Sequence, residues 1–213
     1  MKIKKASCMF TILLMCILIV FGLAACGKEE EIPEYVTTIG AEIADELSSG
    51  QFYLDGDMYQ FPLTVGDFLD NGYSVSANYT NADTFALAPG GQTNSFALVK
   101  EVEDCYQDVH DVRCYVYNPT EEELSLEECM IGKITINAPA KMMFPGGIWE
   151  KTTHEKVISA YGEPRTFDND SDIFYTMLYD IVMEDGSKWE VEIMTNNFDI
   201  CHVVYTWEGM EID

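Results

Sequence analysis

Apolar and polar residues alternate along much of the chain after residue 50, and this period-two pattern predicts antiparallel strands. The pattern is clearest in residues 188–194, where apolar and charged residues would lie on opposite faces: Trp189, Val191 and Ile193 against Lys188, Glu190 and Glu192. Within residues 52–61, Asp55-Gly56 separates two alternating runs and predicts a hairpin with a tight turn. Further strands are predicted at residues 73–75, 84–87, 96–102, 112–117, 131–136, 173–183 and 200–207.

Two short helices interrupt the strands, and each has its own start and stop signals. The first begins at Thr64, a good N-cap residue, and ends at Gly72. The second begins at the capping box Thr152-Thr-His-Glu and ends at Gly162. Because a run of strands follows each helix, we expect an α+β fold in which antiparallel sheets are each covered by a short helix.

The two helix-and-strand segments have the same order of elements, which indicates an internal repeat of roughly 85–90 residues. Two unrelated helix starts are the alternative explanation. The repeat predicts a first α+β unit at residues 41–137 and a second at residues 138–213.

The first 25 residues have the pattern of a secretory signal. Three lysines precede an apolar run from about residue 9 to residue 25. The run ends in Leu23-Ala-Ala-Cys26, which resembles the lipobox of bacterial lipoprotein signal peptides. The resemblance implies that residues 1–25 are removed and that Cys26 carries lipid such as palmitate. An ordinary signal peptide or a single membrane-spanning helix is the alternative.

Residues 26–40 predict a lipid anchor followed by a tether, because they are acidic and contain the breakers Pro33 and Gly40. A lipid on Cys26 would hold the folded part at the cell membrane, facing the extracellular side.

The net charge narrows the range of partners. The chain has 37 acidic and 12 basic residues, a formal charge of −25. Without residues 1–25 the 37 acidic residues would face nine basic ones, a formal charge of −28. Such a surface repels nucleic acid, so we expect no nucleic-acid partner. It favours cationic partners or divalent ions, although solubility alone is the simpler explanation.

The second half also resembles known lipoprotein domains. The motif residues are Gly147, Thr153-His-Glu-Lys-Val157, Tyr161-Gly-Glu-Pro164, Tyr179, Gly186, Val191 and Val203-Val-Tyr205. They are similar to the repeat of β-lactamase-inhibitor-protein-like domains and SmpA/OmlA-type lipoprotein domains, and to lipoproteins of Gram-positive gut bacteria. The match covers about the last 70 residues well and residues 50–136 loosely, and residues 148–151 are an insertion. The resemblance implies tandem helix-on-sheet repeats.

One acidic cluster has the spacing of a calcium loop. Asp168, Asp170 and Asp172 would place alternate oxygens around Ca²⁺. Ile173 and Tyr179 stand where an EF-hand loop needs Gly and Glu, and a polar loop before a strand is the alternative. We therefore expect no cofactor, with Ca²⁺ as the one candidate ion.

Four cysteines remain beyond Cys26, namely Cys105, Cys114, Cys129 and Cys201. In an exported chain they allow two disulfides in three connectivities, and Cys105–Cys114 across a hairpin is the first candidate. Free buried thiols are the alternative. No CxxC pair is present, which argues against a zinc cluster.

No catalytic motif is present. His110, His154 and His202 belong to no HExxH or other close histidine pair, and the chain has no GxSxG, SxxK, P-loop or GxGxxG string. Cys201 and His202 are neighbours in a predicted strand, so their side chains would point to opposite faces. We expect that the chain is not an enzyme.

Aromatic residues are the better candidates for recognition. Trp149 and Trp207 lie near a loop and near the end of the sequence, where an exposed indole could anchor a partner. The leading hypothesis is a membrane-anchored extracellular domain that binds a protein in envelope assembly, sensing or inhibition. Binding of a divalent cation or a cationic small ligand is one alternative, and a hydrolase with an unrecognised site is another.

Overall fold

Three antiparallel sheets and a few short helices make up the part of the chain that the computed structural model describes. That part comprises residues 32–77, 84–93, 95–102, 109–138, 140–169 and 173–210. Its helices are α2 (Glu34–Ile39), α3 (Val65–Asp70) and α4 (His154–Tyr161), with 3-10 turns η1 (Leu47–Ser49) and η3 (Pro145–Gly147). No helix among these residues is long and apolar enough to cross a membrane.

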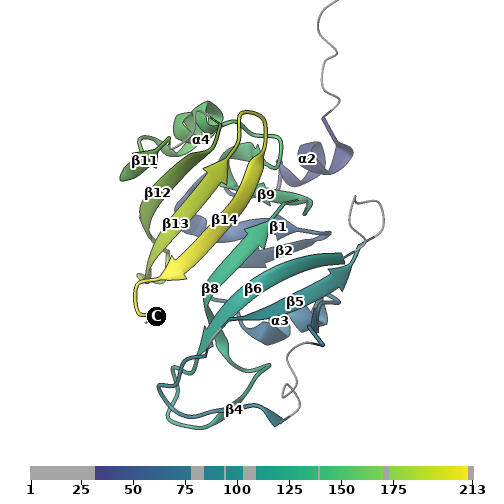
Figure 1. Ribbon diagram of the computed structural model, residues 1–213, viewed down its shortest axis with the longest axis vertical. Coiled ribbons are helices and arrows are strands. Elements are labelled where there is room, and N and C mark those ends of the chain that lie inside the picture. Colours follow the sequence, from purple (N-terminus) through teal and green to yellow (C-terminus); the bar gives the residue numbers. More distant parts are fainter. Residues whose placement is uncertain are drawn as a thin grey trace, which may run out of the picture. The chain divides into compact units, whose positions relative to one another are not determined.

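The largest sheet has eight strands in the order β11-β12-β13-β14-β8-β6-β5-β3 (Figure 1). Their bounds are β3 Ser74–Val75, β5 Phe96–Glu101, β6 Val109–Tyr117, β8 Met130–Asn137, β11 Thr166–Asp168, β12 Tyr175–Val182, β13 Lys188–Thr195 and β14 Ile200–Trp207. A small sheet has the order β10-β9-β1-β2, with β1 Gln51–Leu54, β2 Asp57–Gln60, β9 Met142–Phe144 and β10 Ile148–Trp149. The third sheet pairs β4 (Ala86–Leu87) with β7 (Leu124–Ser125).

The strand order of both main sheets is symmetric about the centre. Each half of the chain gives a strand pair to the small sheet, then a helix, then four strands to the large sheet. The last strands of the two halves, β8 and β14, pair at the centre of the large sheet, and β1 pairs with β9 in the small one. The α+β class is confirmed. The symmetry supports the proposal of two repeats, but the halves share both sheets instead of forming one sheet each.

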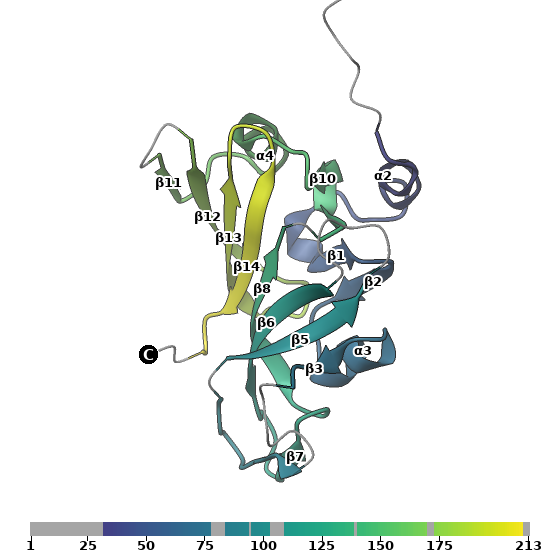
Figure 2. The ribbon, with the colours of Figure 1, turned by 45° about the vertical axis from the view of Figure 1, so that its right-hand side comes forward.

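The core lies between the two main sheets. Figure 2 shows the small sheet and α3 on one side of the large sheet. Phe52 of β1 is fully buried there, and its ring lies 5.2 Å from that of Tyr59, 5.8 Å from Phe61 and 6.1 Å from Tyr205 of β14. One continuous apolar cluster therefore joins the halves of the chain.

Local sequence explains the turns and helix starts. Asp55 (φ 48°) and Gly56 (φ 109°) form the predicted tight turn, a backbone conformation that glycine and aspartate tolerate best. In α3, Thr64 and Asp67 form a capping box. The start predicted for the second helix is wrong by one residue, because Thr153 is the N-cap of α4. The hydroxyl of Thr152 instead accepts a hydrogen bond from the backbone N–H of Trp149 at 3.0 Å.

The predicted tether is too long. Residues 34–39 form α2, whose Tyr35, Val36 and Ile39 pack against the small sheet in a second apolar cluster. The Tyr35 hydroxyl also donates a hydrogen bond to Glu150. These residues form an i, i+1, i+4 apolar stripe, which is typical of a helix that packs on one face. The tether prediction considered only the acidic residues and the helix breakers and therefore missed it. Cys26 and residues 27–31 lie outside the described residues.

The hydroxyl of Tyr205 gives the first prediction. It is fully buried, and no hydrogen-bond partner is present among the described residues. We expect Tyr205→Phe to raise the free energy of unfolding by about 1 kcal/mol, because the substitution removes an unsatisfied buried group. Tyr161→Phe is the matched control, since the Tyr161 hydroxyl donates to the carbonyl of Pro145 at 2.6 Å and its loss should destabilise the fold. Urea denaturation measures the free energy of unfolding of both variants. A clear loss of stability in Tyr205→Phe would contradict the conclusion that the Tyr205 hydroxyl is unsatisfied.

Candidate functional site: the open face of the large sheet

One face of the large sheet is not covered by any described element. We call it the open face, and its side chains are half-buried or exposed. Its central residues are Thr176, Leu178 and Asp180 of β12, Glu190, Glu192 and Met194 of β13, His202, Val204 and Thr206 of β14, Lys133, Thr135 and Asn137 of β8, and Asp111, Arg113 and Tyr115 of β6.

The alternation of residues along the strands produces this face. In β13 the buried residues are Trp189, Val191, Ile193 and Thr195, so the residues between them face outward, as the pattern predicts. Cross-strand register carries the alternation through the sheet, since Ile193 is opposite Val203 and Val203 is opposite Ile136. All three of these side chains are buried on the core side.

Ion pairs order the charged side chains of the open face. Arg165 donates to Asp180 at 2.8 Å and also to Glu190. His202 lies 2.8 Å from Glu192, and this hydrogen bond lowers the pKa of the Glu192 carboxyl. Two looser pairs, each at 3.6 Å, are Arg113 with Asp111 and Lys188 with Glu208.

The open face is therefore much closer to neutral than the rest of the protein. The described residues include 26 acidic and eight basic ones. Half of the basic ones belong to this face: Arg113, Lys133, Arg165 and Lys188. Because their carboxylate neighbours nearly balance them, most of the excess negative charge lies elsewhere.

Three hollows lie along the open face. One of about 380 Å³ involves Ala97, Val99 and Arg113, and one of about 450 Å³ beside it involves Lys133 and Thr135. The third, also about 450 Å³, lies over the ends of β12, β13 and β14 and is lined by Val182, Lys188, Trp207 and Met210, among others. Such hollows give a partner side chain places to enter.

The two predicted tryptophan contacts have different outcomes. Trp149 is only 8% exposed and packs with Tyr53 and Met143, so its prediction as a partner contact is wrong. A position near a loop does not expose a residue when a helix such as α2 packs over it. Trp207 is half-buried, stacks on Tyr117 with ring centroids 4.5 Å apart, and lines the third hollow. It remains a candidate contact.

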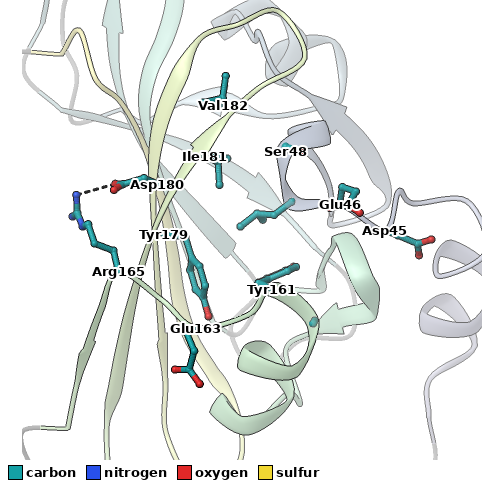
Figure 3. A pocket seen from close by; sticks show the side chains of 12 residues that line it. Asp45, Glu46, Ser48, Tyr161, Glu163, Arg165, Tyr179, Asp180, Ile181 and Val182 are labelled. Carbon is teal, nitrogen blue, oxygen red and sulfur yellow. Dashed lines mark hydrogen bonds and ion pairs between the residues drawn. The ribbon is translucent and has the colours of Figure 1, made fainter.

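Besides these three hollows, a cleft lies on the core side of β12, and Figure 3 shows the side chains that line it. Its volume is about 570 Å³. Tyr161 and Tyr179 form part of its wall with rings at 83° to one another, and Asp45, Glu46 and Glu163 add exposed carboxylates. This cleft shares Arg165, Asp180, Ile181 and Val182 with the hollow that contains Trp207.

The candidate calcium ligands are not brought together by anything that the structure describes. Asp168 is exposed in β11, and Asp170 and Asp172 lie outside the described residues. Within the described ranges, no group of three His, Cys, Asp or Glu residues is placed to hold a metal ion. Calcium binding thus stays a prediction.

The predicted two-disulfide framework is not formed. Cys114, Cys129 and Cys201 are free thiols, and every connectivity of two disulfides would pair two of these three. Cys105 lies outside the described residues. Cys114 is fully buried in β6, and burial raises the pKa of its thiol, as it raises that of Cys129 to about 11. The free buried thiols fit the alternative explanation.

A buried polar cluster escaped the sequence reasoning. The Asp55 carboxylate lies 2.8 Å from His110 Nδ1 and accepts hydrogen bonds from the Tyr73 hydroxyl and the Lys141 N–H, both at 3.0 Å. The side chains of Asp55 and His110 are 0% and 3% exposed. This cluster therefore fastens the β1–β2 turn to β6 and is closed to a substrate in this conformation. The one signal in the sequence was Asp55 itself, but an aspartate is common in a tight turn and so did not indicate a buried cluster.

Comparisons of the chain with protein-family models, with curated proteins and with solved structures find no match. The resemblance to β-lactamase-inhibitor-protein-like and SmpA/OmlA-type domains therefore stays an expectation.

Proposed function

We propose that this chain is a lipid-anchored extracellular protein that binds another protein through the open face and has no enzymatic activity of its own. One observation carries the proposal: an eight-stranded sheet covered on one side exposes its other side as an ordered, nearly neutral surface. On a chain with a formal charge of −25, this is the surface that another protein can approach with the least repulsion.

The size of the open face suits a protein better than a small ligand. Eight strands about 4.8 Å apart span about 34 Å, which accommodates the roughly 800 Å² per partner of a standard interface. Polar, aromatic and aliphatic side chains are mixed on it, including Tyr115, Leu178 and Val204, and this mixture is typical of protein interfaces.

A lipid anchor would keep the protein at the membrane. The lipobox at residues 23–26 supports lipid on Cys26, and seven residues, 27–33, then separate that cysteine from α2. The partner would thus be another envelope protein or a molecule that comes close to the cell surface.

A bulky charge at the centre of the open face tests the proposal. Tagged full-length wild-type chain, Thr135→Arg and Met58→Arg are expressed in the host and cross-linked on intact cells. Thr135 lies in the middle of β8 on the open face, whereas Met58 is 39% exposed on the small sheet. We expect wild type and Met58→Arg to give the same cross-linked partner and Thr135→Arg to lose it.

Equal thermal midpoints of the two variants would show that folding is not the cause. The proposal is wrong if Thr135→Arg keeps the adduct, or if the wild-type chain gives no adduct under conditions where a known envelope complex does.

A further inference from the structure

Strand β12 has an edge that its neighbour leaves unpaired. The short strand β11 pairs only with Thr176, Met177 and Leu178, and Arg165 adds a last hydrogen bond from its N–H to the Leu178 carbonyl at 2.8 Å. Pro164 precedes Arg165 and has no N–H to continue the ladder. Residues 179–182 therefore extend beyond β11 at the outer edge of the large sheet.

The backbone groups at this edge can be assigned. In an antiparallel strand, the N–H and C=O of alternate residues point to the same neighbour. The Leu178 carbonyl points to β11, and the Met183 N–H donates toward β13, to the Ser187 carbonyl at 2.8 Å. The N–H and C=O of Asp180 and Val182 therefore point to the outer edge, and no described residue supplies a strand beside them.

Space exists on both faces of the sheet beside this edge. The cleft of Figure 3 lies on the core side, and the hollow containing Trp207 is lined by the open-face residues Asp180, Lys188, Glu190 and Thr206 together with Trp189 and Trp207. Both reach Asp180, Ile181 and Val182. Because side chains of a strand alternate between faces, a strand added here would direct successive side chains into one hollow and then the other.

The residues around the edge are predominantly acidic. Six carboxylates line the two hollows, against the two cations Arg165 and Lys188: Asp45, Glu46, Glu163, Asp180, Glu190 and Glu208. Arg165 and Lys188 are already within ion-pair distance of three of them. A cationic segment would find complementary charge here.

Apolar contact is available at the same place. Val182 is 57% exposed, although natural sheet edges usually carry charged residues or proline to prevent pairing. The half-buried Trp207 lies in the same hollow as Val182. The aliphatic stem of a lysine or a β-branched side chain would bury against these two residues.

We propose that residues 179–182 of β12 bind an extended, basic segment of a partner protein as an added strand. The inference rests on the proposed function, because the bound segment would belong to the same protein partner. The binding site, however, is the edge of the sheet and not the centre of the open face. Main-chain hydrogen bonds at Asp180 and Val182 would give affinity, and the two hollows would select side chains.

The test uses the full-length chain in nonionic detergent and the peptide acetyl-Lys-Val-Lys-Val-Lys-Val-amide. Val182→Pro removes the N–H that points to the edge, at a position where an edge strand tolerates proline. Val182→Thr is the matched control that keeps this N–H. We expect the peptide to slow amide exchange at Asp180 and Val182 of the wild type. It should bind Val182→Thr like the wild type and Val182→Pro about tenfold more weakly.

Further outcomes separate this inference from charge attraction and from the open-face proposal. Two altered peptides should bind the wild-type chain much more weakly than the Lys-Val peptide does. In one, glutamate replaces each lysine, and in the other, alternate residues are N-methylated. Equal binding to Val182→Pro and Val182→Thr, or unchanged exchange at Asp180 and Val182, overturns the inference. Thr135→Arg should bind the peptide like the wild type. If the wild-type chain binds the peptide but gives no cross-linked adduct on cells, that result contradicts the open-face proposal and leaves the inference about β12 standing.

Discussion

Replacing Asp55 with alanine is expected to lower the free energy of unfolding by about 3–5 kcal/mol, because three partners in a buried polar cluster would each lose a hydrogen bond, at about 1–3 kcal/mol apiece. His110 would lose its carboxylate partner at 2.8 Å, and the Tyr73 hydroxyl and Lys141 N–H would each lose an acceptor. Alanine would also have to adopt the φ of 48° found at this turn. Urea denaturation of the variant measures the loss.

Asp57→Ala is the control for this prediction. Asp57 lies two residues away in the same hairpin and pairs with Lys100 at 2.8 Å, but its side chain is 34% exposed. Its loss should therefore lower the free energy of unfolding by no more than about 1 kcal/mol. Equal losses in the two variants would mean that the Asp55 cluster does not fasten the small sheet to β6 as described.

Replacing Phe52 with alanine should also lower the free energy of unfolding by about 3–5 kcal/mol, because it leaves a cavity where both halves of the chain meet. The Phe52 ring is fully buried and contacts residues of both sheets, including Phe144 and Tyr205. Phe198→Ala is the size-matched control. Phe198 is 75% exposed, so its removal should change the free energy of unfolding by less than about 0.5 kcal/mol.

A single cooperative transition should accompany the loss in Phe52→Ala, since one core joins the halves. Two separate transitions in the wild type, only one of which moves in Phe52→Ala, would instead show that each predicted repeat folds as an independent unit.

Elements determined by nearby residues could be predicted from the sequence. The alternation in residues 188–194 identified the faces of β13, and Asp55-Gly56 identified the first hairpin. The capped helix after Thr64 is likewise present as α3. Each of these features depends on propensity and pattern over a few residues, so no knowledge of the rest of the chain was needed.

Contacts between distant segments could not be predicted in the same way. The pairing of β8 with β14 joins the two halves, and Asp55 meets His110 across 55 positions of sequence. No local pattern specifies such partners. The packing of α2 against Trp149 is a third example, and for that reason the prediction of Trp149 as an exposed contact failed.

The open face could be foreseen only in part. Strand alternation predicted that Glu190 and Glu192 would share one face, and the structure places them there. Whether that face is covered depends on where the small sheet and the three helices pack, which is a property of the whole chain. The grouping of Arg113, Lys133, Arg165 and Lys188 around it likewise follows from strand order and not from sequence spacing.

Site-specific photocross-linking in intact host cells tests the central claim most directly. A photoreactive phenylalanine analogue replaces Val204, at the centre of the open face on β14, or Met58, on the small sheet. The account predicts a discrete protein adduct from position 204 and none from position 58. Adducts of equal yield from both positions, or an adduct from position 58 alone, would contradict protein binding by the open face.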